Sequence, residues 1–173
     1  MTNEIIGRYN DDSLKMALSH IKYKKPRERS ALVIAPLYGT IIHEDDPNRI
    51  MPPRKEASRL IRLIMDKEVP IFYSSPKNYS ATIEDIRLSF LANEEFTLLF
   101  REKRMLPSEG DDLFANLYTK LEAEGIEPQN AFLITTKDDF SNYPRNRLNR
   151  TFLVPPYNEP VPALPVLSDN PIY

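Results

Sequence analysis

The chain has 173 residues, 41% of them hydrophobic, which is enough for one domain with a substantial core. Its net charge of −2 gives no overall attraction toward nucleic acid or an anionic membrane surface. The absence of cysteine excludes disulfides, thiolate metal ligands and cysteine nucleophiles, and four glycines are too few for a glycine-rich phosphate loop.

Residues 1–29 are predicted to form a short helix followed by a basic linker. Apolar side chains recur at helical spacing over residues 11–21, behind possible caps at positions 11 to 13. Residues 22–29 then carry five positive charges and one negative charge. The first residues lack the pattern of a signal peptide, and no apolar stretch approaches the roughly 20 residues that span a bilayer. We therefore expect a cytoplasmic protein without a membrane segment.

Residues 30–155 are predicted to form one α/β domain. An unbroken apolar run at 31–35 is typical of a central parallel strand. Regular alternation of strands and helices favours an open, mainly parallel, five-stranded sheet with helices on both faces. The expected strands are 31–35, 69–73, 96–100, 131–135 and 151–154. The expected helices are 54–67, 82–92 and 111–124, the last with Gly125 as its left-handed C′ residue, and a short one at 143–148.

Residues 156–173 form a tail too rich in proline for a regular element. The tail nevertheless carries several apolar side chains between Pro155 and Tyr173, more than a solvated linker needs. We expect it to wrap across the domain or to dock on a protein partner. It also contains a PxxP pattern, from Pro162 to Pro165, which occurs often by chance in such sequences.

Residues 31–42, ALVIAPLYGTII, resemble the first motif of the haloacid dehalogenase (HAD)-like superfamily. That motif is a strand followed by Asp-x-Asp-Gly-Thr, in which the first Asp is the nucleophile and the second a general acid/base. Gly39 and Thr40 match the pattern, but Pro36 and Tyr38 stand in place of the two acids. The resemblance implies a strand and turn that remain without their catalytic carboxylates.

Two further passages carry the resemblance, which covers about 125 residues in all. Residues 117–136 are similar to the helix-Gly-Ile-x-Pro-x-x-strand passage that leads into the fourth motif. Residues 69–76, VPIFYSSP, resemble the second motif, with Ser74 as its hydroxyl residue and Ser75 next to it. About 33 residues separate Thr40 from Ser74 and about 28 separate Ser75 from Lys103, too few for a cap domain. The resemblance therefore implies a capless, three-layer, Rossmann-like HAD fold.

The third and fourth motifs are incomplete. Lys103 is the best match to the lysine that neutralises the phosphoryl group, with Arg101 and Arg104 as alternatives. Thr135 and Thr136 end the fourth strand, where the family has the acids that hold Mg²⁺. Asp138 and Asp139 follow two residues later, and they are the candidates for a relocated metal site.

We expect a small hydroxyl-rich pocket at the carboxyl ends of the strands, which is the ligand-binding edge in open α/β sheets. An anion could bind there through Ser74, Ser75, Lys103 and Thr136, and the alternative is that these hydroxyls only satisfy strand-end backbone groups. Tyr38 could stack on a ligand or fill the space that the acids and metal would occupy.

The leading hypothesis is a catalytically inactive, HAD-like protein that needs no cofactor and acts as a binding, structural or regulatory subunit. Without a carboxylate nucleophile or an acidic Mg²⁺ site, the reaction of the family is not expected. One alternative is a Mg²⁺-dependent phosphatase that uses the relocated acids. A second is a nucleic-acid-associated protein using residues 22–29 with Arg145, Arg147 and Arg150, beside Tyr23 and Tyr143. The histidines, His20 and His43, do not define a metal site, although Glu44 and Asp46 follow the second.

Overall fold

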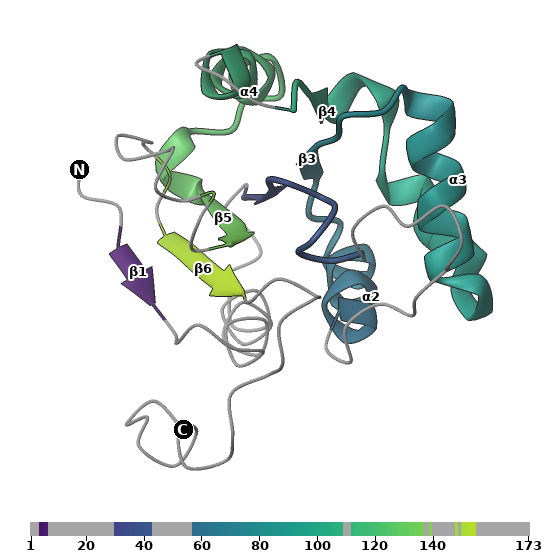
Figure 1. Cartoon of the computed structure of the whole chain (residues 1–173). Helices are drawn as coiled ribbons and strands as arrows, with labels where there is room; N and C mark the ends of the chain where they lie inside the picture. The colour runs from purple at the N-terminus through teal and green to yellow at the C-terminus, as the bar shows by residue number, and fades with distance from the viewer. Residues whose placement is uncertain are drawn as a thin grey trace.

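A computed structural model describes residues 4–6, 30–42, 57–108, 112–136, 139, 148 and 150–154 of the chain. The strands form one parallel sheet of six, in the order β1-β6-β5-β2-β3-β4 (Figure 1). The strands are β1 (Glu4–Ile6), β2 (Ala31–Ile34), β3 (Ile71–Ser74), β4 (Met105–Leu106), β5 (Ala131–Thr136) and β6 (Arg150–Val154). The helices are α2 (Ala57–Lys67), α3 (Tyr79–Ser89) and α4 (Asp112–Ala123).

The predicted α/β class with a mainly parallel sheet is confirmed, and β2, β3, β5 and β6 correspond to predicted strands. With β2 to β6 counted as first to fifth, their spatial order is 3-2-1-4-5, which is the order of a Rossmann-type sheet. β1 is a sixth strand beyond the five predicted, and it was not expected because three residues at a sheet edge are too short to show a pattern.

The predicted strand at 96–100 is wrong, because these residues belong mainly to a 3₁₀ helix, Leu91–Leu99. In a strand, Phe96, Leu98 and Phe100 would share a face. Instead, both phenylalanines are fully buried while Leu98 is 74% exposed, which is a helical spacing of burial. The third strand of the Rossmann-type order is instead β4, which pairs with the end of β3. This strand ends before Pro107, which has no backbone N–H to continue the pairing.

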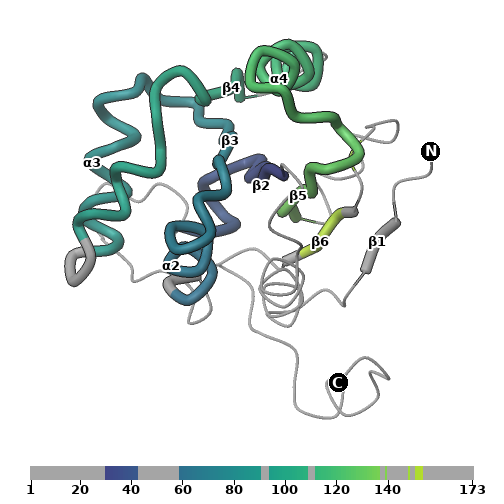
Figure 2. Tube along the Cα trace, turned by 180° about the vertical axis from the view of Figure 1, so that it is seen from behind, coloured from purple at the N-terminus to yellow at the C-terminus, as the bar shows by residue number. Residues whose placement is uncertain are grey.

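Both faces of the sheet are buried, and alternate residues of each central strand contribute to different cores. Leu32 and Ile34 of β2 belong to a cluster with apolar residues of α2, α3 and the 3₁₀ helix. Ala31 and Val33 belong to a second cluster with three leucines of α4. In Figure 2, α2 and α4 accordingly lie on opposite sides of the row formed by β3, β2 and β5. This double burial explains why the strands read as continuous apolar runs.

The helices begin and end where local chemistry satisfies their backbone. Asn78 caps α3 by accepting a 2.8 Å hydrogen bond from the Ala81 N–H, so this helix starts three residues before the predicted position 82. Gly125, with φ of 70°, follows α4 as the predicted C′ residue. Glu68, with φ of 55°, has the same role after α2. Both helix ends have the two reversed backbone hydrogen bonds of a Schellman motif.

Several predicted segments lie outside the described residues. They include the helix at 11–21, the basic segment 22–29, the tail from 156 and most of the short helix at 143–148. In the part of the chain that the structure describes, no helix is long and apolar enough to cross a membrane.

Candidate functional site

The strand order reverses between β2 and β5, and open α/β sheets bind ligands at the carboxyl edge beside such a reversal. Three predicted site segments meet at this edge. They are the turn after β2, the end of β3 at Ser74 and Ser75, and the end of β5 at Thr135 and Thr136. The sequence therefore placed these segments on the same edge correctly.

The turn after β2 is tightly packed and remains attached to both neighbouring strands. Ala35 donates its N–H to the Ile134 carbonyl at 3.1 Å, and Leu37 donates to the Ser74 carbonyl at 3.0 Å. The Ala35–Pro36 peptide bond is cis. Gly39 takes a φ of 94°, which other residues rarely adopt, and donates to the Ile42 carbonyl at 2.8 Å. This backbone path holds the half-buried Tyr38 in place.

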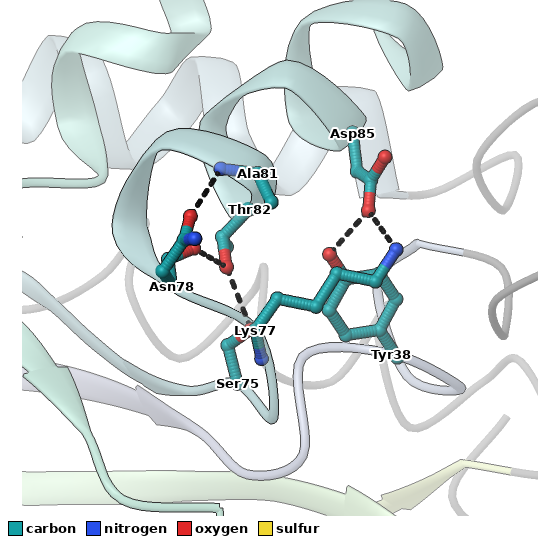
Figure 3. A network of polar contacts seen from close by, with 7 residues as sticks. All are labelled: Tyr38, Ser75, Lys77, Asn78, Ala81, Thr82 and Asp85. Carbon is teal, nitrogen blue, oxygen red and sulfur yellow. Dashed lines mark hydrogen bonds and ion pairs between the residues drawn. The ribbon is translucent and has the colours of Figure 1, made fainter.

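Tyr38 belongs to a network with Lys77 and Asp85 (Figure 3). Its hydroxyl donates to Oδ2 of Asp85 at 2.5 Å, and Nζ of Lys77 lies 2.7 Å from the same oxygen. Nζ also lies 5.2 Å from the centroid of the Tyr38 ring, within the range of a cation–π contact. The positive and negative charges of this network therefore compensate one another.

Burial, followed by the hydrogen bond to Asp85 and the charge of that carboxylate, raises the pKa of the Tyr38 phenol well above its ordinary value of 10.0. A phenol with a raised pKa stays protonated at neutral pH, and it is a poor general acid there.

A second set of hydrogen bonds joins the end of β3 to the start of α3, as Figure 3 also shows. The hydroxyls of Ser75 and Thr82 lie 2.7 Å apart, and Thr82 donates to the Asn78 carbonyl at 2.8 Å. The Lys77 N–H donates to Oγ of Ser75 at 3.1 Å. Ser75, a predicted ligand residue, is therefore engaged within the fold.

The remaining hydroxyls of this edge fall into two kinds. Thr136 donates to Oδ2 of Asp139 at 2.5 Å and accepts the Asp139 N–H at 3.1 Å. The hydroxyls of Ser74 and Thr135 are buried, and neither has a hydrogen-bond partner among the described residues. An unsatisfied buried hydroxyl costs about 1–3 kcal/mol, so these two atoms require an explanation.

Lys103 does not lie at the carboxyl edge of the sheet, where the sequence analysis predicted it. It belongs to a short 3₁₀ helix, Glu102–Arg104, before β4, and its side chain is exposed. Leu106 of β4 is level with Ser74, so Lys103 precedes the level of Ser74 by three residues. The expectation depended on a third strand at 96–100, and with β4 at the third position Lys103 lies toward the amino edge of the sheet. Among the described residues, Lys77 is a cation that lies at the carboxyl edge, where it pairs with Asp85.

No metal site forms within the described ranges, where no three His, Asp or Glu side chains make a group that could hold an ion. Asp139 lies beside the end of β5 through its bonds to Thr136, whereas Asp138 lies outside the described residues. The same is true of His20, His43, Glu44, Asp46, Arg145 and Arg147.

Sequence reasoning missed Lys77 and Asp85, which contact Tyr38, and also Asn78 and Thr82, which belong to the hydrogen bonds at the start of α3. One signal was available, because an Asn two residues after Pro76 is a common helix cap. With α3 starting at Tyr79, Thr82 and Asp85 are three residues apart and therefore lie on one helix face.

The comparisons with known proteins provide no family assignment. No protein-family model matches the chain, and no curated protein matches it.

Proposed function

We propose that this chain is a capless, three-layer, HAD-like domain that has lost the chemistry of that superfamily and works by binding, as a structural or regulatory subunit of a protein complex. The observation that carries the proposal is the Tyr38 network. At the positions of the two motif acids stand Pro36 and a phenol whose hydroxyl is bonded to Asp85, beside Lys77. A compensated, half-buried network of this kind is suited to holding a turn in one conformation.

The first experiment tests the loss of catalysis. Purified protein is assayed with p-nitrophenyl phosphate in the presence of Mg²⁺, beside the variants Tyr38→Phe and Asp139→Asn. We expect no Mg²⁺-dependent turnover that differs between the three proteins. Turnover that persists through purification and is abolished by either substitution would contradict the proposal.

The second experiment tests binding through the tail. The full chain and a version ending at Pro155 are used to capture partners from the native source. We expect a stoichiometric protein partner with the full chain and its loss on truncation. Capture by both versions would place the binding surface on the folded domain instead, and capture by neither would count against a subunit role.

One observation favours the alternative of a phosphatase with relocated acids, because Asp139 lies at the carboxyl edge beside β5. A double substitution, Asp138→Asn with Asp139→Asn, distinguishes the two functions. If both acids bind Mg²⁺, the double variant loses metal affinity and activity together, whereas a binding subunit shows no change in either.

A further inference from the structure

Ser74 and Thr135 lie in one row across the sheet, on the two strands that flank β2. Ile34 is level with Tyr73 on β3 and with Ile134 on β5. The next residue, Ala35, is therefore level with both hydroxyl residues. Because neighbouring strands are about 4.8 Å apart, the Cα atoms of Ser74 and Thr135 are separated by about 9–10 Å, with one methyl group between them.

Both hydroxyls face α4. Residues alternate between the two faces of a strand, and Phe72 and Leu133, two positions before Ser74 and Thr135, pack in the α4 cluster with Ala35. Asp85 lies on α3, and Tyr38 packs against the cluster on the opposite face. The row is therefore separate from the Tyr38 network.

The two residues differ from their direct neighbours in hydrogen bonding. Ser75 and Thr136, one position further along, are bonded to Thr82 and Asp139. Ser74 is 1% exposed and Thr135 is 0% exposed, and neither hydroxyl has a partner among the described residues. Native folds pair nearly all of their buried hydroxyls, so two unpaired hydroxyls in one row point to a ligand.

The surroundings determine the chemical class of this ligand. Leu106 and Leu153 extend the row on its two sides, and Leu148 packs in the same cluster. On this face the cation Arg104 lies over the ring of Phe72 at 5.9 Å, and its charge is compensated by Glu124 at 2.7 Å. Lys103 lies toward the other edge, and the first turn of α4 contains an acid, Asp112. An anion would gain little from such a site, whereas an uncharged molecule with a short carbon frame suits the apolar surroundings.

We propose that Ser74 and Thr135 form the two ends of a binding site for a small uncharged polyol. Two hydrogen bonds of about 2.8 Å each across this separation leave about 4 Å between the ligand oxygens, the scale of a three-carbon polyol. The proposal extends the binding role inferred above by naming a ligand, and it uses neither the tail nor the Tyr38 network. If no protein partner is captured, the ligand proposal is therefore unaffected. If the ligand does not bind, the proposed subunit role is unaffected.

The test is a titration of the full chain with glycerol, followed by ¹H–¹⁵N NMR, with inorganic phosphate as the charged comparison. Ser74→Ala and Thr135→Val remove one hydroxyl each, and Tyr79→Phe, which removes a hydroxyl in the first turn of α3, is the control. We expect saturable shifts at the carboxyl ends of β2, β3 and β5 in the native protein and the control. Either hydroxyl variant is expected to bind at least tenfold more weakly. Saturation separates binding from the general stabilisation that polyols give any protein.

Thermal unfolding without ligand provides the second measurement. An unpaired buried hydroxyl opposes folding, so both variants are expected to unfold at the same temperature as the native protein or higher. Three results would overturn the proposal: no saturable shift with glycerol, equal binding by the variants, or phosphate binding at the same residues. A clear fall in unfolding temperature for Thr135→Val would also overturn it, because the hydroxyl would then serve the fold.

Discussion

At Tyr38, burial and a neighbouring carboxylate act on one phenol in the same direction. Both raise its pKa, and Lys77 compensates the charge of Asp85 from the other side. The result is a neutral hydroxyl held by a carboxylate. The chemistry of the residue therefore agrees with a positioning role.

Tyr38→Phe should lower the free energy of unfolding by about 1 kcal/mol, because the hydrogen bond to Asp85 is lost while the ring and the Lys77–Asp85 ion pair remain. Urea denaturation measures the effect. Tyr79→Phe, in the first turn of α3, is the control, and we expect it to stay within about 0.5 kcal/mol of the native protein. An equal loss in both variants would show that the Tyr38 hydroxyl bond is not specifically stabilising.

Alkaline titration should reveal the late ionisation of two described tyrosines, Tyr38 and Tyr73. Burial is the largest cause that raises the pKa of Tyr38 and of Tyr73 above the ordinary 10.0. The unfolded chain therefore releases these two protons at lower pH than the folded chain does. Their contribution to stability is complete below pH 10.0 and declines as the pH rises above that value.

The measurement is tyrosinate absorbance against pH, read together with circular dichroism. We expect two tyrosines to ionise late, with or after unfolding, and only one of them to do so in Tyr38→Phe. Ionisation of Tyr38 and Tyr73 near the ordinary pKa of 10.0, in a chain that is still folded, would contradict this prediction.

At the scale of single elements, the ends of α2 and α4 have the same backbone geometry with different residues. After α4, Ile126 donates to the Leu121 carbonyl at 2.9 Å, and after α2, Val69 donates to the Ile64 carbonyl at 3.1 Å. The left-handed residue between these bonds is Gly125 in one case and Glu68 in the other. Only the glycine avoids the Cβ strain of positive φ.

Opposite substitutions at these two helix ends should have opposite effects. Glu68→Gly is expected to raise the free energy of unfolding by about 0.5–1 kcal/mol, because it removes strain at an exposed position. Gly125→Ala is expected to lower it by about 1 kcal/mol through backbone strain alone, since an added Cβ meets no atom within 4 Å. Denaturant unfolding of both variants tests the pair, and effects of the same sign would refute the shared geometry.

The segment at 96–100 shows where reasoning about a single element fails. FTLLF is apolar and short, and such a run does not distinguish a buried strand from a helix. The decision depends on packing, because Phe96 stacks edge-to-face on Phe90 at 5.5 Å and Tyr73 of β3 stacks on Phe100 at 5.3 Å. These contacts connect the 3₁₀ helix with α3 and the sheet, and they are not visible in the local pattern.

At the scale of the whole molecule, the sheet has a buried centre and short edges. β2 pairs along its full length with β5 and over Leu32 to Ile34 with β3, and all four of its residues are 0% exposed. The edge strands β1 and β4 have three and two residues. The most stable backbone should therefore be at the centre, where opening requires the loss of both cores.

Hydrogen exchange followed by NMR or mass spectrometry checks this prediction. We expect the amides of β2 and β5 to exchange slowest, at rates set by global unfolding, and those of β1 and β4 to exchange much faster. Protection of β4 equal to that of β2 would mean that the edge of this sheet is covered by another part of the chain or by a second molecule.

The sequence by itself determined the class of the fold and the edge that holds the site. Continuous apolar runs indicated strands buried on both faces, and the order of strands and helices implied a parallel sheet. Strand ends in a parallel sheet meet at one edge, so the sequence predicts that Pro36, Tyr38, Ser74 and Thr136 lie at the same edge. Gly125 was also identified as a helix end from its residue type alone.

Only the tertiary structure decided which side chains interact. Lys77 and Asp85 reach Tyr38 because α3 starts at an unrecognised cap, and Lys103 points elsewhere because β4 replaces the expected third strand. The four neighbouring hydroxyls read alike in the sequence, yet two are satisfied within the fold and two are not. Hydrogen bonds depend on distances of tenths of an ångström between segments far apart in the chain, and no local pattern encodes those distances.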